Sequence, residues 1–494
     1  MLEKFSLSEP ITMSSEAASE RKRVRQSAGP HECPGRKCCG VLVTLALEEG
    51  SQLQNSPGMA SSCAKPHLII SLFVGCLLFA SPARPAVSPS AAVNSTTLPV
   101  KHSRISAHLK RVNKPASPDG DLIDCVPSHL QPAFDHPKLR DHKPSVCDFF
   151  RIESLTDQGL RRWFDATSTV VGRLQDPPER PKGYSLSSTV DASFQAWSIS
   201  GESCPEGTVP IRRTTREDML RASSVQRFGR KPAARRLRRD STSTGHEHAV
   251  GYIIGDQYYG AKASLSVWAP RVTSASEFSL SQIWVISGSF GNDLNTIEAG
   301  WQVSPQLYGD NRPRFFTYWT SDAYQETGCY NLLCSGFVQT NNRIAIGAAI
   351  SPTSALNGGQ FDIDLLVWKD PKHGHWWLEL GSGLLVGYWP SFLFSHLAEH
   401  ANMVQFGGEI VNAQTSGFHT STQMGSGHFA GEGFRKASYF RNLQLVDWDN
   451  SLIPLSNLRL LADHPNCYSI QGGVNAVWGN YFYYGGPGRN VRCP

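Results

Sequence analysis

The sequence predicts an all-β protein, an antiparallel, jelly-roll-like β-sandwich preceded by a smaller region. From Gly245 to Pro494, short alternating and aromatic runs follow one another closely and are separated by Gly, Asn, Asp and Pro, residues that form turns. More than ten such runs occur in about 250 residues, and one stretch, Ser391 to Ala401, is typical of a helix. Many short strands joined by turns are the pattern of a sandwich.

Each expected strand is rich in β-branched and aromatic residues, which fit a pleated and half-buried surface. We expect strands at residues 252–254, 263–268, 278–286, 297–303, 314–319, 343–347, 361–368, 375–380, 384–389, 403–406 with 410–411, and 443–448. In the preceding region, residues 216–221 are expected to form a helical turn that Thr214 or Thr215 opens.

Charge divides the chain into two parts. The chain has 494 residues, of which 40% are hydrophobic and 10% aromatic, enough for two or three globular domains. Residues 245–494 contain 13 Lys and Arg against 18 Asp and Glu, a net charge of −5, so residues 1–244 carry +10 within the overall charge of +5. Parts of opposite charge are expected to have different roles and to attract each other.

An apolar run at residues 68–80 has the pattern of a secretory signal peptide. Lys65 precedes the run and small residues follow it, and translation from Met59 would place it at an N-terminus. A buried helix and a signal anchor are weaker interpretations, because proline-rich small residues follow and the run is shorter than a membrane span. We expect secretion and no stable membrane anchor.

These observations divide the chain into four expected regions. They are residues 1–58, a gene-model extension or leader; 59–83, the signal peptide; 84–244, the region before the sandwich; and 245–494, the expected β-sandwich. Asn94 lies in an Asn-Ser-Thr sequence and is an expected glycosylation site of residues 84–244.

The cysteines agree with secretion. Residues 245–494 contain four of them, for which three pairings are possible: Cys329, Cys334, Cys467 and Cys493. The first two are close enough to close a small loop, and the last two would tie down the chain end, so we expect these two disulfides. Zinc is a weaker interpretation, because it normally needs two tight pairs of cysteines.

A basic run from Arg230 to Gly245 ends the region that precedes the expected sandwich. It has almost no apolar residues, so we expect an exposed linker that is open to proteolysis. Such charges can also bind nucleic acid, but a signal peptide upstream argues against that partner.

The search for catalytic motifs leaves carboxylates. The chain lacks a Gly-x-Ser-x-Gly elbow, and pairing of the cysteines leaves no thiol for catalysis in residues 245–494. His396 and His400 lack the Glu of a His-Glu-x-x-His motif, and Gly407-Gly408 has no nearby Lys for a phosphate loop. We therefore expect no metal and no cofactor.

Glu298 and Glu409 are the candidate catalytic residues. Each lies in an expected strand beside glycines, which permit close approach of another backbone. Two carboxylates close together cannot both ionise readily, so one can activate water while the other, protonated, polarises a scissile carbonyl. Sequence spacing alone favours a different interpretation, in which both are solvent-facing strand residues.

Segments across residues 249–494 resemble neprosin, a secreted glutamic peptidase of plants that cleaves after proline. The matching segments are Ile297-Glu-Ala-Gly-Trp301, Leu307-Tyr-Gly-Asp310, Thr327-Gly-Cys-Tyr-Asn331, Cys334-Ser-Gly-Phe337, Gly387-Tyr-Trp-Pro390, Gly407-Gly-Glu409 and Met424-Gly-Ser-Gly427. Residues 119–125, 131–137 and 204–213 resemble the activation peptide of that family, whereas residues 1–58 have no counterpart and 147–200 differ from the usual pro-segment.

The resemblance implies that residues 84–244 are an activation or pro-region and residues 245–494 the catalytic domain. It also implies that Glu298 and Glu409 are the catalytic pair of an acid-active endopeptidase. Trp301, Tyr388 and Trp389 are candidates to hold a proline ring, with core packing as the alternative. The pro-region would inhibit the enzyme until low pH weakens its attraction to the catalytic domain and the linker is cut.

We expect a monomer that acts on peptides in the cell wall or an acidic extracellular fluid. A carbohydrate-binding or structural β-sandwich protein of the cell wall is an alternative, because fold does not fix function. A glycosidase is another, because carboxylate pairs also hydrolyse glycosides.

Overall fold

The computed structural model describes residues 117–140, 142, 177–184, 194–199, 201–231, 245–381, 383–414 and 417–494. The expected leader, the signal peptide, Asn94 and linker residues 232–244 lie outside these ranges. Within the described ranges, every helix is too short or too polar to cross a membrane.

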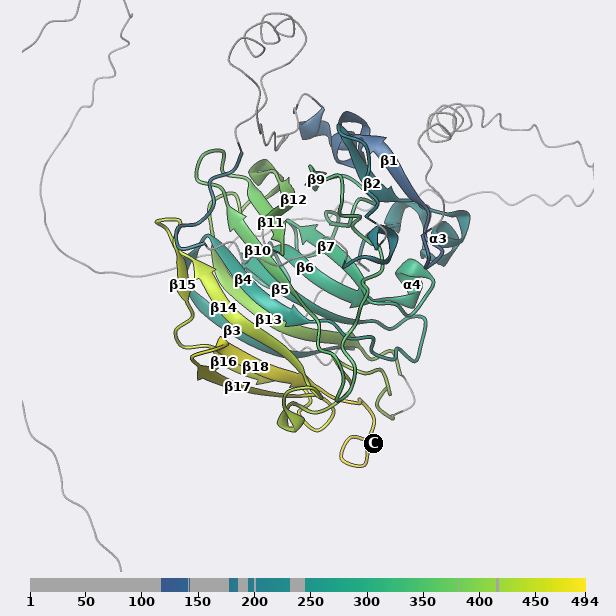
Figure 1. Cartoon of the computed structure of the whole chain (residues 1–494), viewed down its shortest axis with the longest axis vertical. Helices are drawn as coiled ribbons and strands as arrows, with labels where there is room; N and C mark the ends of the chain where they lie inside the picture. Colours follow the sequence, from purple (N-terminus) through teal and green to yellow (C-terminus); the bar gives the residue numbers. More distant parts are fainter. Residues whose placement is uncertain are drawn as a thin grey trace, which may run out of the picture. The chain divides into compact units, whose positions relative to one another are not determined.

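Two antiparallel sheets form a β-sandwich, which confirms the predicted fold class (Figure 1). One sheet has seven strands, whose central strands carry the candidate catalytic residues. In spatial order these strands are β16 (Arg459–Ala462), β3 (His246–Tyr258), β13 (Ala401–Val411), β5 (Ser279–Ser287), β6 (Asn295–Val303), β7 (Arg314–Thr320) and β8 (Cys329–Tyr330).

The second sheet has nine strands. In spatial order they are β17 (Ser469–Asn475), β18 (Gly479–Gly485), β14 (Ser438–Val446), β4 (Gly260–Ser266), β10 (Asp362–Lys369), β11 (Trp376–Leu380), β12 (Leu384–Trp389) and β9 (Val338–Gln339), with β15 (Leu452–Pro454) beside β14. Short helices join some strands of the sandwich: α4 (Pro305–Tyr308), η7 (Ser391–Leu393) and η8 (Ala430–Glu432).

Apolar side chains from both sheets fill the space between them. Successive residues of a strand point to opposite faces, so β6 sends Ile297, Ala299 and Trp301 into this core. Glu298, between them, points to the outer face, where it contacts Lys231. The alternation of β6 therefore separates the core of the sandwich from the candidate site.

The described part of the pro-region forms short elements that pack against the sandwich. They are β1 (Ile123–Pro127), η1 (Ser128–Leu130), η2 (Pro132–Asp135), η3 (Pro137–Leu139), η4 (Ala196–Ser198), β2 (Thr208–Arg212), α3 (Arg216–Arg221) and η5 (Val225–Arg227). The antiparallel pair β1 and β2 adjoins the Cys125–Cys204 disulfide. The predicted helical turn is confirmed as α3, which Thr215 opens with a reciprocal capping box.

Pro-region residues are buried against both sheets. Ala133 and Leu139 join Trp377 of β11 in an apolar cluster on the outer face of the nine-stranded sheet. On β7, the guanidinium of Arg314 is 1% exposed and lies 2.5 Å from the carboxylate of Asp121. Because a buried charge is costly without its partner, the pro-region is part of the folding unit of the precursor.

Two predictions of local structure are wrong. Residues 391–401 form only the short η7 before β13, because the side-chain oxygen of Asn295 accepts hydrogen bonds from three consecutive amides, those of residues 395–397. Residues 343–347 form no strand. The side chain of Gln195 from the pro-region accepts from the backbone amide of Ala345 and donates to its carbonyl. In both segments a distant side chain satisfies the backbone that regular structure would otherwise satisfy.

The four cysteines of the catalytic domain are joined in two disulfides. Cys329 pairs with Cys334, and Cys467 pairs with Cys493, as expected from their spacing. The second disulfide fixes the end of the chain beside residues 464–468 of the turn that follows β16.

Candidate active site

Glu298 and Glu409 point to the same face of the seven-stranded sheet, on either side of β5. Glu298 of β6 pairs with Trp284, and Glu409 of β13 pairs with Leu280. Residues 280 and 284 of one strand share a face, so the two carboxylates share it as well. Their backbones are separated by two strand spacings, about 10 Å, and by four residues along the strands, about 13 Å.

The Glu298 carboxylate is fully buried and accepts hydrogen bonds from several donors. Its Oε1 accepts from the hydroxyls of Thr296 and Tyr324, both at 2.9 Å. Its Oε2 accepts from the Gln282 amide at 3.1 Å and from Lys231 Nζ at 2.7 Å. Lys231, from the pro-region, is the cation of this group.

Lys231 is the last residue of the pro-region that the structure describes, and its side chain reaches the candidate site. Its ammonium lies over the rings of Tyr318 and Tyr324, at 4.8 and 5.0 Å from their centroids. Burial opposes the charge of Lys231, but the carboxylates of Glu298 and Glu409, with nearby tyrosines, raise its pKa well above the usual value. The ammonium therefore stays charged and lies within electrostatic range of both glutamates.

Glu409 is 4% exposed and is held by imidazoles of the neighbouring strand. His246 Nδ1 hydrogen-bonds its Oε1, and His248 Nε2 lies 3.9 Å from the same oxygen. Burial would raise the pKa of Glu409, but His246, Lys231 and His248 together lower it to about 2. Glu409 is therefore ionised in the precursor.

Asp463 orients His248 behind Glu409. The Asp463 carboxylate accepts from the backbone amide of His248 and contacts its Nδ1, both at 2.9 Å. Burial lowers the pKa of His248, but Asp463 and Glu409 outweigh burial and raise it. Asp463, His248 and Glu409 thus form a line of alternating charges.

Gln282 lies between the two glutamates on the outer face of β5. It pairs with Gly300 of β6 and Gly407 of β13, and its side chain is fully buried. Its amide donates to Glu298, while its Oε1 has no hydrogen-bond partner among the described residues. A buried and unpaired acceptor between two carboxylates is a place where a water or a substrate N–H can bind.

The glycines beside the glutamates have a packing role. A Cβ on Gly300 would lie 2.0 Å from the carbonyl oxygen of Ser281, and a Cβ on Gly408 would lie 2.5 Å from the Tyr484 ring. Only glycine lets the neighbouring backbone and ring approach so closely.

The three aromatic residues proposed for substrate binding lie in the protein interior. Trp301 is fully buried between the sheets, where its indole N–H donates to the carbonyl of Ser266 at 2.9 Å. Trp389 is also in this core, while Tyr388 is buried on the outer face of the nine-stranded sheet. None of the three faces the glutamates, because the alternation of their strands directs them elsewhere.

Sequence reasoning missed Lys231, Gln282, Tyr324, His246 and His248. His246 and His248 had a usable signal, because residues two apart in a strand share a face and both rings could meet a neighbouring strand. Lys231 lies in the basic run for which the sequence predicts only an exposed linker. Tertiary contacts alone identify the remaining two.

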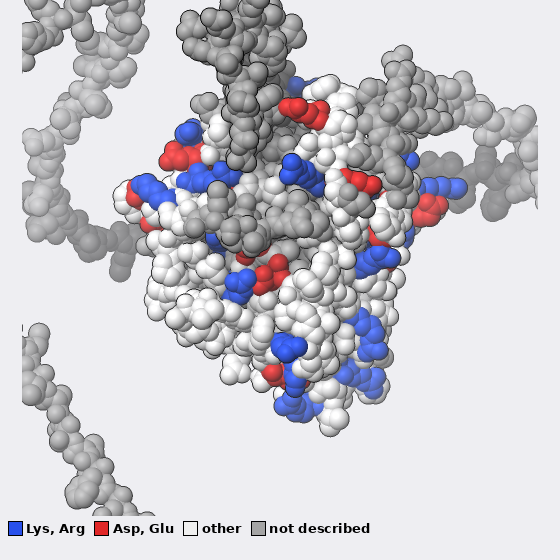
Figure 2. Space-filling model, in the orientation of Figure 1, with Lys and Arg blue, Asp and Glu red and all other residues white. Residues whose placement is uncertain are grey.

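Among the described residues, four ion pairs also join the pro-region to the catalytic domain. Three have a basic pro-region residue and an acidic catalytic-domain residue, and one is reversed: Lys231–Glu298, Arg180–Glu379, Lys182–Asp449 and Asp121–Arg314. On the face shown in Figure 2, charges of both signs lie in small groups between large uncharged areas. The electrostatic attraction expected between the two oppositely charged parts of the chain therefore acts through these ion pairs.

Two family comparisons match consecutive parts of the chain. The sequence model of neprosin matches residues 275–487, and that of the neprosin activation peptide matches residues 114–252. The second match includes Lys231 and extends into β3, and the first includes Glu298 and Glu409.

Among solved structures, the chain is similar to glutamic peptidases at low identity. Scytalido-glutamic peptidase with a transition state analog inhibitor is 11% identical, with 49% of this chain and 98% of that chain covered and a TM-score of 0.27. SCP-B, a member of the Eqolisin family in a complex with the tripeptide Ala-Ile-His, is 10% identical, with 49% and 98% covered and a TM-score of 0.26. TM-scores of this size do not bear on the site.

Proposed function

The chain belongs to the neprosin family and is a peptidase with its own activation peptide, and from this premise we propose that it is a glutamic endopeptidase that cleaves after proline. Glu298 and Glu409 are its catalytic residues. The observation that carries the proposal is the position of Lys231. An activation peptide that places a buried ammonium on Glu298, within range of Glu409, blocks the group that hydrolysis would require.

Glu409 is the general base in this proposal. Its neighbours His246 and His248 belong to the catalytic domain, so they remain when the activation peptide leaves, and they favour the ionised carboxylate. An ionised carboxylate beside the outer face of β5 can take a proton from water as the water attacks a peptide carbonyl.

Glu298 is the acid partner. Removal of Lys231 leaves its buried carboxylate with the neutral donors Gln282, Thr296 and Tyr324. In this role Glu298 carries the proton of the pair and donates a hydrogen bond to the scissile carbonyl. The protonated Glu298 would then polarise the carbonyl and later pass its proton to the leaving amine.

The space that the Lys231 ammonium occupies in the precursor lies beside Glu298 Oε2, the oxygen that also accepts from the Gln282 amide. Water is of similar size and can take the place of the ammonium after activation. Glu298 and Glu409 would then act on a substrate that lies across β5, and their separation leaves room for a peptide and a water between them.

Cleavage after proline, secretion and activity in an acidic extracellular fluid are supported by family membership and by the expected signal peptide. Linker residues 232–244 directly follow Lys231, so a cut there would free the lysine from the chain that continues into β3. The proposed activation is therefore a cut in the linker followed by departure of Lys231 from the site.

A carbohydrate-binding protein would be favoured by a flat row of exposed aromatic rings. A group of aromatic rings near the surface contains Phe434, Trp478, Tyr481 and Tyr483. Three of its ring pairs meet edge against face, at 78°, 89° and 74°, and Trp478 and Tyr483 meet at 52°. The rings pack on one another and form no flat platform for a sugar.

The test is hydrolysis of a fluorogenic proline-containing peptide by the acid-activated protein. Glu298→Gln and Glu409→Gln are each expected to lower kcat/KM by about 10²- to 10⁴-fold, because each removes a proton-transfer group. Glu432→Gln, which changes a carboxylate outside the site, should retain full activity. A peptide with alanine in place of proline tests specificity, and full activity in either site variant would contradict the mechanism.

A further inference from the structure

A second group of titratable side chains lies on the other side of β3, away from the proposed catalytic residues. Glu247, His419 and His464 form it, and we call it the Glu247 cluster. Each offers one ligand atom, and these atoms lie within 4.8 Å of one another. We propose that the Glu247 cluster binds a zinc ion that holds the first strand of the catalytic domain in place.

The ring of His419 is oriented for metal binding. Its Nδ1 lies 2.8 Å from the carbonyl oxygen of Thr420, and because a carbonyl only accepts, Nδ1 carries the proton. In the neutral ring the lone pair is then on Nε2, which lies 2.9 Å from both carboxylate oxygens of Glu247. A backbone carbonyl that fixes the tautomer in this way is a usual outer partner of a zinc-bound histidine.

His464 supplies an independent observation. Its Nδ1 is buried and lies 2.8 Å from Glu247 Oε2, yet it makes no hydrogen bond among the described residues. The nitrogen and the oxygen therefore face each other without the geometry of donor and acceptor. A proton on that nitrogen, or a metal ion bound to both atoms, would make the contact favourable, and the second arrangement needs no donor geometry.

A proton on His419 is the competing way to neutralise the cluster. Burial lowers the pKa of His419, but contact with Glu247 and with the Thr420 carbonyl raises it. Protons on both imidazoles would account for both contacts with Glu247, so metal uptake distinguishes the two arrangements. A metal ion satisfies both imidazoles and the carboxylate together.

Zinc suits the number and kind of donors. Two imidazole nitrogens and one carboxylate leave the fourth tetrahedral position open for water. Glu247 and His419 are 5% and 10% exposed, whereas His464 is 41% exposed, so the open side faces solvent. Metal bonds of about 2.0–2.1 Å place tetrahedral ligand atoms about 3.3 Å apart. The two contacts with Glu247, at 2.8 and 2.9 Å, would therefore lengthen slightly, and the two histidine nitrogens, which lie within 4.8 Å of each other, would approach.

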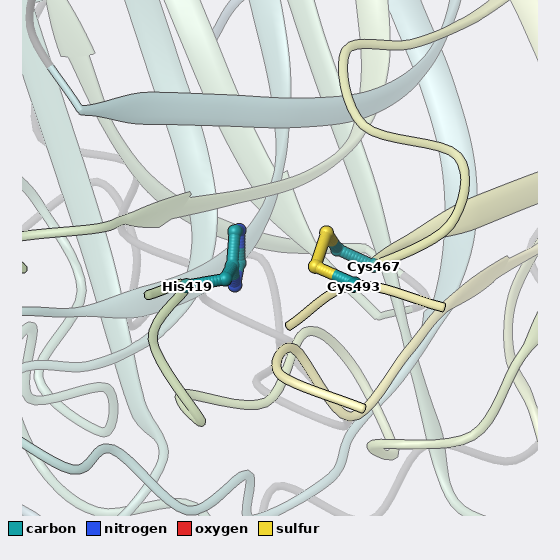
Figure 3. A group of neighbouring side chains, drawn as sticks. All are labelled: His419, Cys467 and Cys493. Atoms are coloured by element: carbon teal, nitrogen blue, oxygen red, sulfur yellow. A yellow bond between two sulfur atoms is a disulfide. The ribbon is translucent and has the colours of Figure 1, made fainter. Parts of the chain in front are cut away.

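Sulfur atoms near His419 are not part of the site. Figure 3 shows the His419 ring beside Cys467 and Cys493, whose sulfur atoms are joined to each other. A metal binds the thiolate form of cysteine, and the disulfide removes that form. The disulfide instead holds the chain end against His419, whose amide donates to the carbonyl of Pro494 at 2.9 Å.

The position of the cluster gives zinc a structural role. Glu247 is at the start of β3, which follows the linker, and it lies between His246 and His248, the residues that contact Glu409. His419 and His464 come from two other segments, so one ion would cross-link three parts of the chain. After a cut in the linker, this cross-link would keep the new end of β3, and with it the imidazoles, in place.

Zinc uptake by the full precursor, purified without a histidine tag and treated with a chelator, tests the site independently of peptidase activity. We expect one zinc per chain by elemental analysis after gel filtration, and a rise in Tm of a few degrees when zinc is about 100 times its Kd. Cobalt should give the visible absorption of a tetrahedral ion.

His464→Ala and Glu247→Gln should each weaken zinc binding at least about 10-fold. His464→Ala is the safer variant because its side chain is partly exposed, and His428→Ala, which removes an imidazole 3.0 Å from Glu432, is the matched control. Absence of zinc uptake by the parent would overturn the proposal, as would equal uptake by His464→Ala. Neither result would bear on the catalytic glutamates, whose test needs no metal.

Discussion

Glu298 and Glu409 share one face of one sheet, but different parts of the chain hold them. The cation of Glu298 is Lys231 of the pro-region, and its other partners are neutral. Glu409 contacts the imidazoles of His246 and His248 of β3, and Asp463 supports the second of them. One carboxylate therefore depends on the activation peptide for its cation, while the other also has imidazole partners within the catalytic domain.

This difference separates the two proposed roles. A carboxylate that keeps its imidazoles on activation stays ionised and can serve as base. A carboxylate that loses its only cation becomes easier to protonate and can serve as acid. Departure of one lysine would thus both open the site and set the protonation state of Glu298.

The largest expected effect follows from removing Lys231. Lys231→Met leaves the Glu298 carboxylate buried without a cation, and loss of one partner of a buried pair costs about 3–5 kcal/mol. Urea unfolding of the uncleaved precursor measures this cost. Lys231→Met with Glu298→Gln should recover part of the loss, because the buried charge is gone.

The exposed pair of Lys182 and Asp449 is the control for this prediction. Both side chains are more than half exposed, at 59% and 51%, so Lys182→Met should cost less than about 1 kcal/mol. Equal costs for Lys182→Met and Lys231→Met would contradict a special role for the lysine at Glu298.

The next effect concerns pH and Glu409. Its pKa is about 2 in the folded precursor, against an ordinary value of 4.5, which corresponds to about 3 kcal/mol. A lowered pKa stabilises the fold above pH 4.5, and this contribution is lost as the pH falls from 4.5 toward 2. Free energies of unfolding at pH 7, 4 and 3 should fall more steeply for the parent than for Glu409→Gln. If the free energy of unfolding falls with pH equally for both proteins, Glu409 does not contribute to acid instability.

Gln282 contacts only one of the two glutamates, so it should affect them unequally. Gln282→Leu removes the 3.1 Å hydrogen bond to Glu298, and such bonds to charged groups contribute about 1.5–3 kcal/mol. We expect a loss of precursor stability of that size and an activity below that of the parent. The fall in the free energy of unfolding between pH 7 and pH 3, which reports on Glu409, should be the same as in the parent. A changed acid dependence would show that Gln282 couples the two carboxylates.

Periodicity and turn residues predicted the sandwich because alternation of strand residues and turn chemistry are local properties of a sequence. They could not predict η7, since Asn295, about 100 residues away, satisfies its neighbouring amides. The positions of Glu298 and Glu409 on a common face also follow from pairing through β5, which one strand alone does not encode. Lys231 was missed because the sequence of a basic run does not show which of its residues will be buried.

The smallest effect on the site is expected from the opposite face of β6. Trp301 follows Glu298 on β6, but its ring lies between the sheets and its indole N–H donates to the carbonyl of Ser266. Trp301→Phe should lower the free energy of unfolding by about 1–3 kcal/mol, because the buried carbonyl loses its donor. The KM for a proline-containing peptide should change by less than about twofold, since no substrate contact is removed. A large rise in KM with little loss of stability would return Trp301 to the substrate-binding site and would require β6 to present a different face.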